Sequence, residues 1–386
     1  MPAKRGMSCA SRGLWCGKTE TVSGTGCRRL ASYYPRPVPT RQLVIAGIAL
    51  AAAASGALHY AGANAILAFV VATVALAGLA WVVSFATEQV GERFGPRVAG
   101  VLQSTLGNLP EFFIVVFALR AGETVVAQTS IIGSIFANAL LVLGVVLVAG
   151  AAVADDGVMR FGVRLPRDNA TLMLLASFLI VIVAVAVQSH NPAGRHVKAI
   201  SIAGAAVLLV TYVFWLVDYL RSDVPSEPAP EAEGILPFGA ALALLAAAGV
   251  GAAFVSDWFI AALRPAMSRL GVPDAFAGLV IVAIAGNAVE NTAGITLALK
   301  GQADLAISVV KNSVAQIAAF LFPALVLVSL LFTTTLTFQL APVFVAALAA
   351  TALALWQITA DGEARVFEGV ALIATYAILA VVTWFE

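Results

Sequence analysis

The chain has 386 residues, of which 61% are hydrophobic and only 11% are charged, and its mean hydropathy is +0.97. Soluble globular proteins carry about 25% charged residues, so this composition excludes a soluble protein. The apolar runs are continuous and rich in Ala, Leu and Val, which excludes a β-barrel, because barrel strands alternate polar and apolar residues. The sequence therefore predicts an all-α polytopic membrane protein. The formal net charge of +1 identifies no class of partner.

Residues 1–41 are predicted to form a basic, disordered tail. They hold eight Lys and Arg residues against one acidic residue, Glu20, and no apolar core that is typical of a secretory signal. All three cysteines, Cys9, Cys16 and Cys27, lie in this tail at a spacing that matches no zinc or redox pattern. We expect the tail to stay on the cytoplasmic side of the membrane, where positive charge gathers.

About eleven apolar stretches that are long enough to cross a bilayer follow the tail, since a span needs roughly 20 apolar residues. The predicted spans are 42–60, 62–87, 97–119, 124–150, 168–188, 197–219, 235–257, 273–299, 303–331, 336–358 and 365–385. With a cytoplasmic N-terminus, the tail and the inner loops hold 16 Lys and Arg residues and the outer loops hold five. This asymmetry follows the positive-inside rule. It supports a cytoplasmic N-terminus and a C-terminus on the outer side. We also expect a multi-pass protein of a bacterial inner membrane, with membrane lipid as a partner.

A pentapeptide pattern occurs twice in the spans, once at 107–111 (Gly-Asn-Leu-Pro-Glu) and once at 286–290 (Gly-Asn-Ala-Val-Glu), 179 residues later. The same shift superposes Gly122 on Gly301 and Ser134 on Ser313. The copies lie in the third and eighth predicted spans, so they cross the membrane in opposite directions. Inverted repeats of this kind are typical of secondary transporters, whose site lies near the midplane where the repeats meet.

The repeat defines a domain organisation of two inverted five-helix units plus one extra helix. The predicted parts after the tail are an extra transmembrane helix at 42–60, a first repeat at 61–220 (spans 2–6), an acidic, proline-rich linker at 221–234 and a second repeat at 235–386 (spans 7–11). The linker is interpreted as a solvated tether.

Each copy places a carboxylate within an apolar span, where it is costly and marks a functional site by default. Asn108 and Glu111 lie three residues apart and share a helix face, as do Asn287 and Glu290. Further candidate ligands on the spans that follow each copy are Ser134, Asn138, Ser313 and Gln316. This set offers only oxygen atoms, which suit a hard cation such as Ca²⁺ better than zinc or copper. Two carboxylates that face one cavity bind protons when no cation is present, so one site could exchange a cation for protons.

The two pentapeptide stretches, together with the runs 133–138 and 312–316, resemble the α-repeats of the Ca²⁺:H⁺ antiporters, the CAX family of the Ca²⁺/cation antiporter superfamily. The resemblance covers roughly residues 62–386. It implies a transporter rather than an enzyme, with Ca²⁺ and H⁺ as transported ions and no further cofactor. It also implies that Glu111 and Glu290 bind the cation and the protons, with accessory ligands at Asn108, Asn287, Ser134, Asn138, Ser313 and Gln316.

Three residues depart from the family pattern, namely Asn291 where the family has His, Asn312 where it has Gly, and Lys311 within the ninth span. They leave open an exchanger of the same fold for Na⁺, K⁺ or Mn²⁺. Glu88 and Asp257, which end the second and seventh predicted spans at related places, are candidate gating residues, and Lys311 is a candidate modulating residue.

A passive cation channel is the alternative from another class, although a channel would need a symmetric pore ring. The spans contain no paired-Asp, H-E-x-x-H or Ser/His arrangement that is typical of an enzyme. We expect inorganic cations as ligands and no nucleic acid partner, and the sequence leaves the oligomeric state open.

Overall fold

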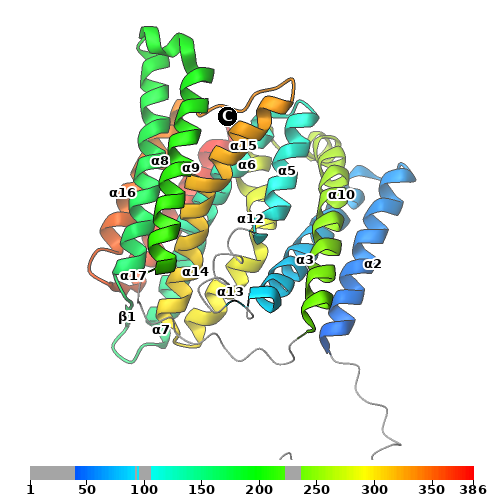
Figure 1. Ribbon diagram of the computed structural model, residues 1–386, viewed down its shortest axis with the longest axis horizontal. Helices are drawn as coiled ribbons and strands as arrows, with labels where there is room; N and C mark the ends of the chain where they lie inside the picture. The colour runs from blue at the N-terminus through cyan, green and yellow to red at the C-terminus, as the bar shows by residue number, and fades with distance from the viewer. Residues whose placement is uncertain (1–39, 92–93, 95–105, 222–235) are drawn as a thin grey trace, which may run out of the picture. The chain divides into compact units, whose positions relative to one another are not determined.

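The computed structural model describes residues 40–91, 94, 106–221 and 236–386 (Figure 1). Within these ranges it does not describe the side chains of Thr40, Arg164, Leu165, Val289 and Glu290. Nearly all of the predicted tail and linker lies outside the described residues. The chain divides into Met1–Val44 and Ile45–Glu386, and every contact discussed below lies within the second unit.

The described chain is almost entirely helical, with η marking π or 3₁₀ turns. The elements of the first half are α2 (Thr40–Tyr60), α3 (Ala65–Gly91), α5 (Leu109–Arg120), α6 (Thr124–Phe136), η2 (Ala137–Val142), α7 (Leu143–Val153), β1 (Val158–Arg160), α8 (Arg164–Gln188), η3 (Pro192–His196) and α9 (Val197–Arg221). Those of the second half are α10 (Phe238–Leu270), α11 (Asp274–Phe276), η4 (Ala277–Val282), α12 (Ala283–Gly286), α13 (Ala288–Leu299), α14 (Ala303–Gln316), η5 (Ile317–Leu321), α15 (Phe322–Val328), η6 (Ser329–Leu331), α16 (Pro342–Ile358), β2 (Glu363–Arg365) and α17 (Val366–Trp384).

Eight helices in the described part of the chain are long and apolar enough to cross a membrane, and a bent pair, Asp274–Gly286 with Asn291–Leu299, would make nine. The prediction of a multi-pass helical membrane protein is confirmed. The predicted count of eleven is not confirmed, because the third predicted span is described only from residue 106 and α16 is a shorter apolar helix of 17 residues.

The predicted ends of two spans were wrong. The seventh span was expected to end at the acidic Asp257, but α10 continues to Leu270 and stops at Gly271, whose left-handed φ of 67° is typical of a glycine that ends a helix. Asp257 lies on an exposed face of α10, so its charge does not interrupt the helix. The tenth span was expected from residue 336, but α16 begins at Pro342, because proline is suited to a first helical turn.

The repeat in the sequence is also a repeat in local structure. α5 and α13 are each 12 residues long and begin 179 residues apart, at Leu109 and Ala288. The glycines that follow them, Gly122 and Gly301, have left-handed φ values of 80° and 74°. The π turns η2 and η5 occur at matching places in the two copies. Equal sequence spacing therefore produces helices α5 and α13 of equal length, the same left-handed glycine turns, and π turns that begin within one residue of matching positions.

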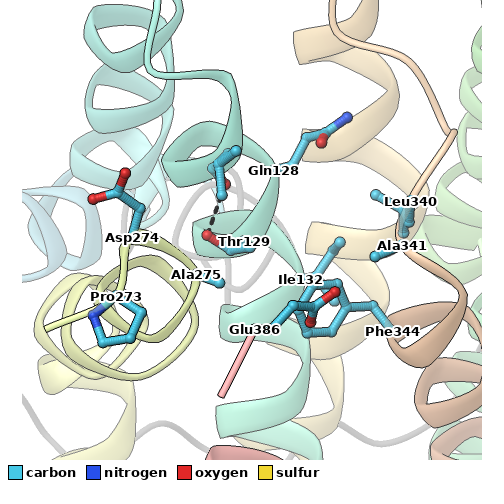
Figure 2. Close-up of a pocket in the computed structure, with 11 residues that line it drawn as sticks. Gln128, Thr129, Ile132, Pro273, Asp274, Ala275, Leu340, Ala341, Phe344 and Glu386 are labelled. Carbon is cyan, nitrogen blue, oxygen red and sulfur yellow. Dashed lines mark hydrogen bonds between the residues drawn. The ribbon is translucent and has the colours of Figure 1, made fainter. Parts of the chain in front are cut away.

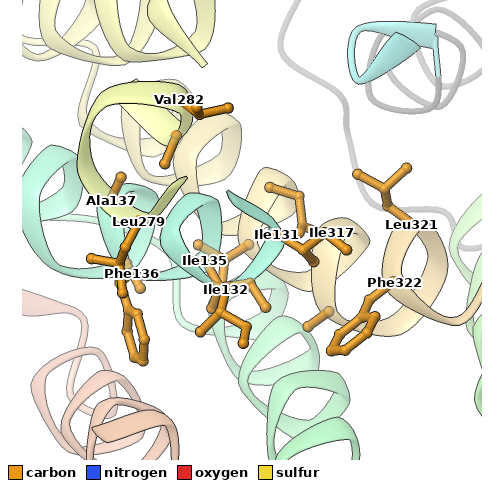
Figure 3. Packing of buried hydrophobic residues seen from close by; sticks show 14 of the residues in the cluster. Ile131, Ile132, Ile135, Phe136, Ala137, Leu279, Val282, Ile317, Leu321 and Phe322 are labelled. Atoms are coloured by element: carbon orange, nitrogen blue, oxygen red, sulfur yellow. The ribbon is translucent and has the colours of Figure 1, made fainter. Parts of the chain in front are cut away.

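Helices of the two repeats pack directly on each other, α3 against α10, α6 against η4 and α7 against α17. Small residues allow transmembrane helices to approach closely. A Cβ atom added at Gly133 of α6 would lie 2.5 Å from the Cα of Leu279 in η4. Figure 3 shows that Leu279 lies among buried side chains of α6 such as Ile135 and Phe136. Backbone contact thus fixes the spacing of α6 and η4.

Contacts between loops agree with the predicted sides of the membrane. Strands β1 and β2 form an antiparallel two-stranded ribbon in which Val158 pairs with Arg365, and the amide of Gly162 donates to Asp304 Oδ1 over 2.5 Å. The loop that contains β1 and Gly162, the loop that contains β2 and the loop before Asp304 are all predicted inner loops. Arg264 and Glu123, which form an ion pair of 3.1 Å, belong to two predicted outer loops.

Candidate functional site

Four polar side chains that the sequence singled out form one buried hydrogen-bonded network. Asn287 Nδ2 donates to Ser134 Oγ over 2.8 Å and to the carbonyl of Ala283 over 2.9 Å. Asn138 Nδ2 donates to Asn287 Oδ1 over 3.1 Å and to Ser313 Oγ over 2.9 Å. All four side chains are at most 2% exposed. The network therefore joins the two sequence repeats directly, side chain to side chain, within the core.

Breaks in two helices place the asparagines of the pentapeptides. Asn108 and Asn287 are the residues before α5 and α13, with backbone angles outside the helical region (φ −84°, ψ 7° and φ −102°, ψ 13°), and neither side chain caps its own helix. In the first copy, residues 107–108 form a turn and α5 starts at Leu109, so the helix is interrupted beside Gly107 and Pro110. The second copy is interrupted without a proline, and its two parts are bent by 58°.

The two predicted carboxylates occupy matching backbone positions in the first turns of α5 and α13. Glu111 is 3% exposed, and Asn108, one turn before it, is 5% exposed. The N-terminal end of a helix carries partial positive charge, and the Glu111 carboxyl group lies in the first turn of α5. The side chain of Glu290 is not described, so its approach to Glu111 stays a prediction.

π turns adjoin both ligand-bearing helices. Asn138 lies in η2, and Gln316 immediately precedes η5; such turns often occur at functional sites. Gln316 is 2% exposed, and among the described residues its Oε1 atom accepts no hydrogen bond. Gln316 thus offers a buried acceptor oxygen one turn beyond Ser313.

Lys311 has a partner that the sequence did not indicate. Its Nζ donates to Thr359 Oγ1 over 2.6 Å, and both residues are 2% exposed. The neighbouring Asn312 accepts a bond of 2.7 Å from Asn169 Nδ2 on α8. Neither Thr359 nor Asn169 could be identified from the sequence, because Thr359 follows α16 and Asn169 lies on α8, and the positions of both helices depend on tertiary packing.

The candidate gating residues do not match each other. Glu88 is half-buried in the last turns of α3, whereas Asp257 is exposed thirteen residues before the end of α10. The expectation that they occupy related places was wrong, because α10 is longer than predicted and the 179-residue shift places Asp257 opposite Gly78. Asp257 lines a cavity of about 430 Å³ beside Arg120, Glu123 and Arg264. A gating role for either residue stays a prediction.

A second cavity, of about 390 Å³, lies between the start of α6 and the segments around Asp274 and Phe344 (Figure 2). Its wall includes Ile132, two residues before Ser134, and Thr129, whose hydroxyl donates to the carbonyl of Val125 over 2.7 Å. The predicted topology places this cavity on the outer side.

The described residues hold no group of three or more His, Cys, Asp or Glu side chains that could bind a metal ion. Of the predicted ligands, the structure therefore offers the Glu111 carboxylate together with amide and hydroxyl oxygens. This donor set suits a hard cation.

Comparisons with known proteins agree with this architecture. Residues 64–218 and 240–385 match the family model described as sodium/calcium exchanger protein. The chain is 30% identical over 346 residues to the Ca(2+)/H(+) antiporter ChaA of Bacillus subtilis, which covers 88% of this chain and 97% of that protein. It is also 30% identical over 325 residues to the vacuolar calcium ion transporter of Schizosaccharomyces pombe, covering 82% of this chain and 78% of that protein. The solved structure of native YfkE has a TM-score of 0.72 and 28% identity, covering 88% of this chain and all of that one.

Proposed function

The chain belongs to the sodium/calcium exchanger protein family, and we propose that it is a secondary active antiporter that exchanges Ca²⁺ for H⁺ across the membrane. The observation that carries the proposal is the buried network in which Asn138 and Asn287 connect the serines of both repeats. The printed name of the Bacillus subtilis relative, Ca(2+)/H(+) antiporter, supports the choice of ions.

The proposed site combines two carboxylates, Glu111 and Glu290, with the neutral oxygens around them. Ca²⁺ takes six to eight oxygen ligands, which is more than two carboxylates supply. The accessory ligands would be Asn108, Asn287, Ser134, Asn138, Ser313 and Gln316. When the cation leaves, the uncompensated negative charge within the protein binds protons. Ca²⁺ and protons therefore cannot occupy the site at the same time.

Alternating access would result from relative movement of helix groups around this fixed site. Repeats of opposite orientation typically rock against each other about a midplane site. The helix breaks at Asn108 and Asn287 allow the two halves of a span to move separately. We further propose a bacterial inner membrane with a cytoplasmic N-terminus as the location, with lipid and inorganic cations as the partners and no further cofactor or nucleic acid.

The test is Ca²⁺ uptake into inverted membrane vesicles driven by an imposed pH gradient. We expect uptake by the natural chain and its loss in Glu111→Gln and in Glu290→Gln. Asp155→Asn is the matched control, because Asp155 is an exposed acid in the loop after α7 and should leave uptake unchanged. Uptake retained in either glutamate variant would contradict the shared-site mechanism.

A second candidate function is exchange of Na⁺, K⁺ or Mn²⁺ by the same fold. The observation that favours it is Lys311, an amino group buried two residues from Ser313. Competition by these ions in the same vesicles distinguishes the two candidates. Voltage-driven current without proton coupling would instead support a passive channel.

A further inference from the structure

Three consecutive residues of α14 each bond to a different element. Successive helical residues point about 100° apart, so three such bonds restrain both the rotation and the axial position of the helix. The three bonds are Lys311 to Thr359 at the end of α16 (2.6 Å), Asn312 to Asn169 on α8 (2.7 Å) and Ser313 to Asn138 on η2 (2.9 Å).

The matching helix of the first repeat has no such polar side chains at the first two of these positions. The 179-residue shift places Ile132 opposite Lys311 and Gly133 opposite Asn312. Gly133 allows the backbone of α6 to lie directly against Leu279 of η4. The two serines of the site are therefore positioned in different ways, one by backbone contact and the other by side-chain bonds.

The environment of Thr359 explains how a buried lysine is accommodated. Thr359 is the residue after the last turn of α16, and its hydroxyl donates in turn to the carbonyl of Leu355 over 2.7 Å. The C-terminal end of a helix carries partial negative charge and favours a cation. The amino group of Lys311 thus lies at the one end of α16 that stabilises a positive charge.

We propose that Lys311 is a positioning and specificity-determining residue of the cation site. Its bond to the end of α16, together with the Asn169–Asn312 bond, sets the rotation of α14 and so determines where Ser313 and Gln316 present their oxygen atoms. The proposal rests on the proposed function, because it assumes that these two residues contact the transported cation.

The test uses variants that remove each end of the bond. Lys311→Met removes the amino group, Thr359→Val removes the acceptor at nearly constant volume, and Thr359→Ser keeps it. Ile132→Met is the matched control, because it places the same side chain at the corresponding position of the first repeat. Each variant is assayed for the Ca²⁺ concentration at half-maximal uptake, for competition by Mn²⁺, and for deuterium exchange of α14 in the purified chain.

We expect Lys311→Met and Thr359→Val each to raise the half-maximal Ca²⁺ concentration about three- to tenfold, the range that one hydrogen bond within a membrane accounts for. Both should change the preference for Ca²⁺ over Mn²⁺ and speed exchange of α14, and the double variant should add little to the larger single effect. Thr359→Ser and Ile132→Met should behave like the natural chain.

The proposal would be overturned if Lys311→Met and Thr359→Val both kept the natural preference for Ca²⁺ over Mn²⁺. This holds even if both variants were less stable, because a residue with a merely structural role would affect stability alone. Additive effects would overturn it as well. If Lys311→Met does not fold, Thr359→Val compared with Thr359→Ser gives the same decision. If the natural chain takes up no cation, the proposed function fails. The positioning role of the Lys311–Thr359 bond is then tested separately, by whether deuterium exchange of α14 is faster in Thr359→Val.

Discussion

Gly133 is the position where a single added methyl group should have the largest effect on the site. It lies at the contact between α6 and η4, and the next residue, Ser134, accepts the hydrogen bond from Asn287. In Gly133→Ala the new Cβ would lie 2.5 Å from the Cα of Leu279 and closer still to its carbonyl oxygen. Both obstacles are backbone atoms, so no side-chain rotation relieves the overlap.

The size of the effect follows from these distances. Carbon atoms pack at about 3.5 Å or more, so α6 and η4 must separate by about 1 Å. A shift of that size would lengthen the 2.8 Å bond from Asn287 to Ser134 beyond hydrogen-bonding distance. Overpacking costs about 1–3 kcal/mol, and the lost bond adds about 0.6–1.7 kcal/mol. We therefore expect Gly133→Ala to lower the free energy of unfolding by about 2–4 kcal/mol and to impair transport.

The assay combines unfolding by SDS titration with pH-driven Ca²⁺ uptake. Gly47→Ala is the control, because Gly47 lies on the exposed face of α2 with no atom within 4 Å of an added Cβ. That variant should be neutral or more stable by up to about 1 kcal/mol. Natural stability and uptake in Gly133→Ala would refute the close backbone contact between α6 and η4.

Three further predictions concern the network, the repeat and the ribbon. Asn138→Ala removes two donated bonds from a buried amide, so the free energy of unfolding should fall by about 1–3 kcal/mol in an SDS titration; an unchanged value would contradict the network. Gly122→Ala and Gly301→Ala should each cost about 1–2 kcal/mol, because only backbone strain acts at these open, left-handed positions, and a loss in one variant alone would contradict the structural repeat. In the ribbon, the hydrogen bond from Arg160 holds the pKa of Asp156 below its ordinary value of 3.8. The Asp156–Arg160 pair therefore stabilises the fold above pH 3.8, and this contribution is lost as the pH falls through the lowered pKa of Asp156. Arg160→Ala should raise the Asp156 pKa to its ordinary range in a carboxyl ¹³C NMR titration, and an unmoved pKa would contradict the pairing.

The repeat and the polar residues of the network were predictable, because both are visible in the sequence itself. Apolar runs of sufficient length identified most spans, and the fixed 179-residue shift identified the matching helices. Asn138 and Ser313 were singled out as candidate oxygen ligands in the apolar spans that follow the two pentapeptides. The structure shows in addition that Asn138 donates a hydrogen bond directly to Ser313.

The rest depended on tertiary packing. Asp257 looked like the end of a span because it is charged, but the charge faces outward from a continuing helix. Lys311 was a candidate modulating residue, but its bond to Thr359 was not predictable, because nothing in the sequence shows that the end of α16 lies beside the middle of α14. The interruption of the eighth span at Asn287 also lacks the proline that marks the first copy.

The donors and acceptors of the network show why asparagine suits its centre. An asparagine amide has two N–H donors and one acceptor oxygen. Both donated bonds of Asn138 are made within the network, to Asn287 and Ser313, and both donated bonds of Asn287 go to Ser134 and Ala283. The positive ends of both amides are therefore held by the protein itself, through the serine, asparagine and carbonyl oxygens that accept their bonds. Because these N–H groups are bonded within the protein, the network would present oxygen atoms to a hard cation. Aspartate at the same positions would also offer oxygen atoms, but it has no N–H donor with which to hold the serines.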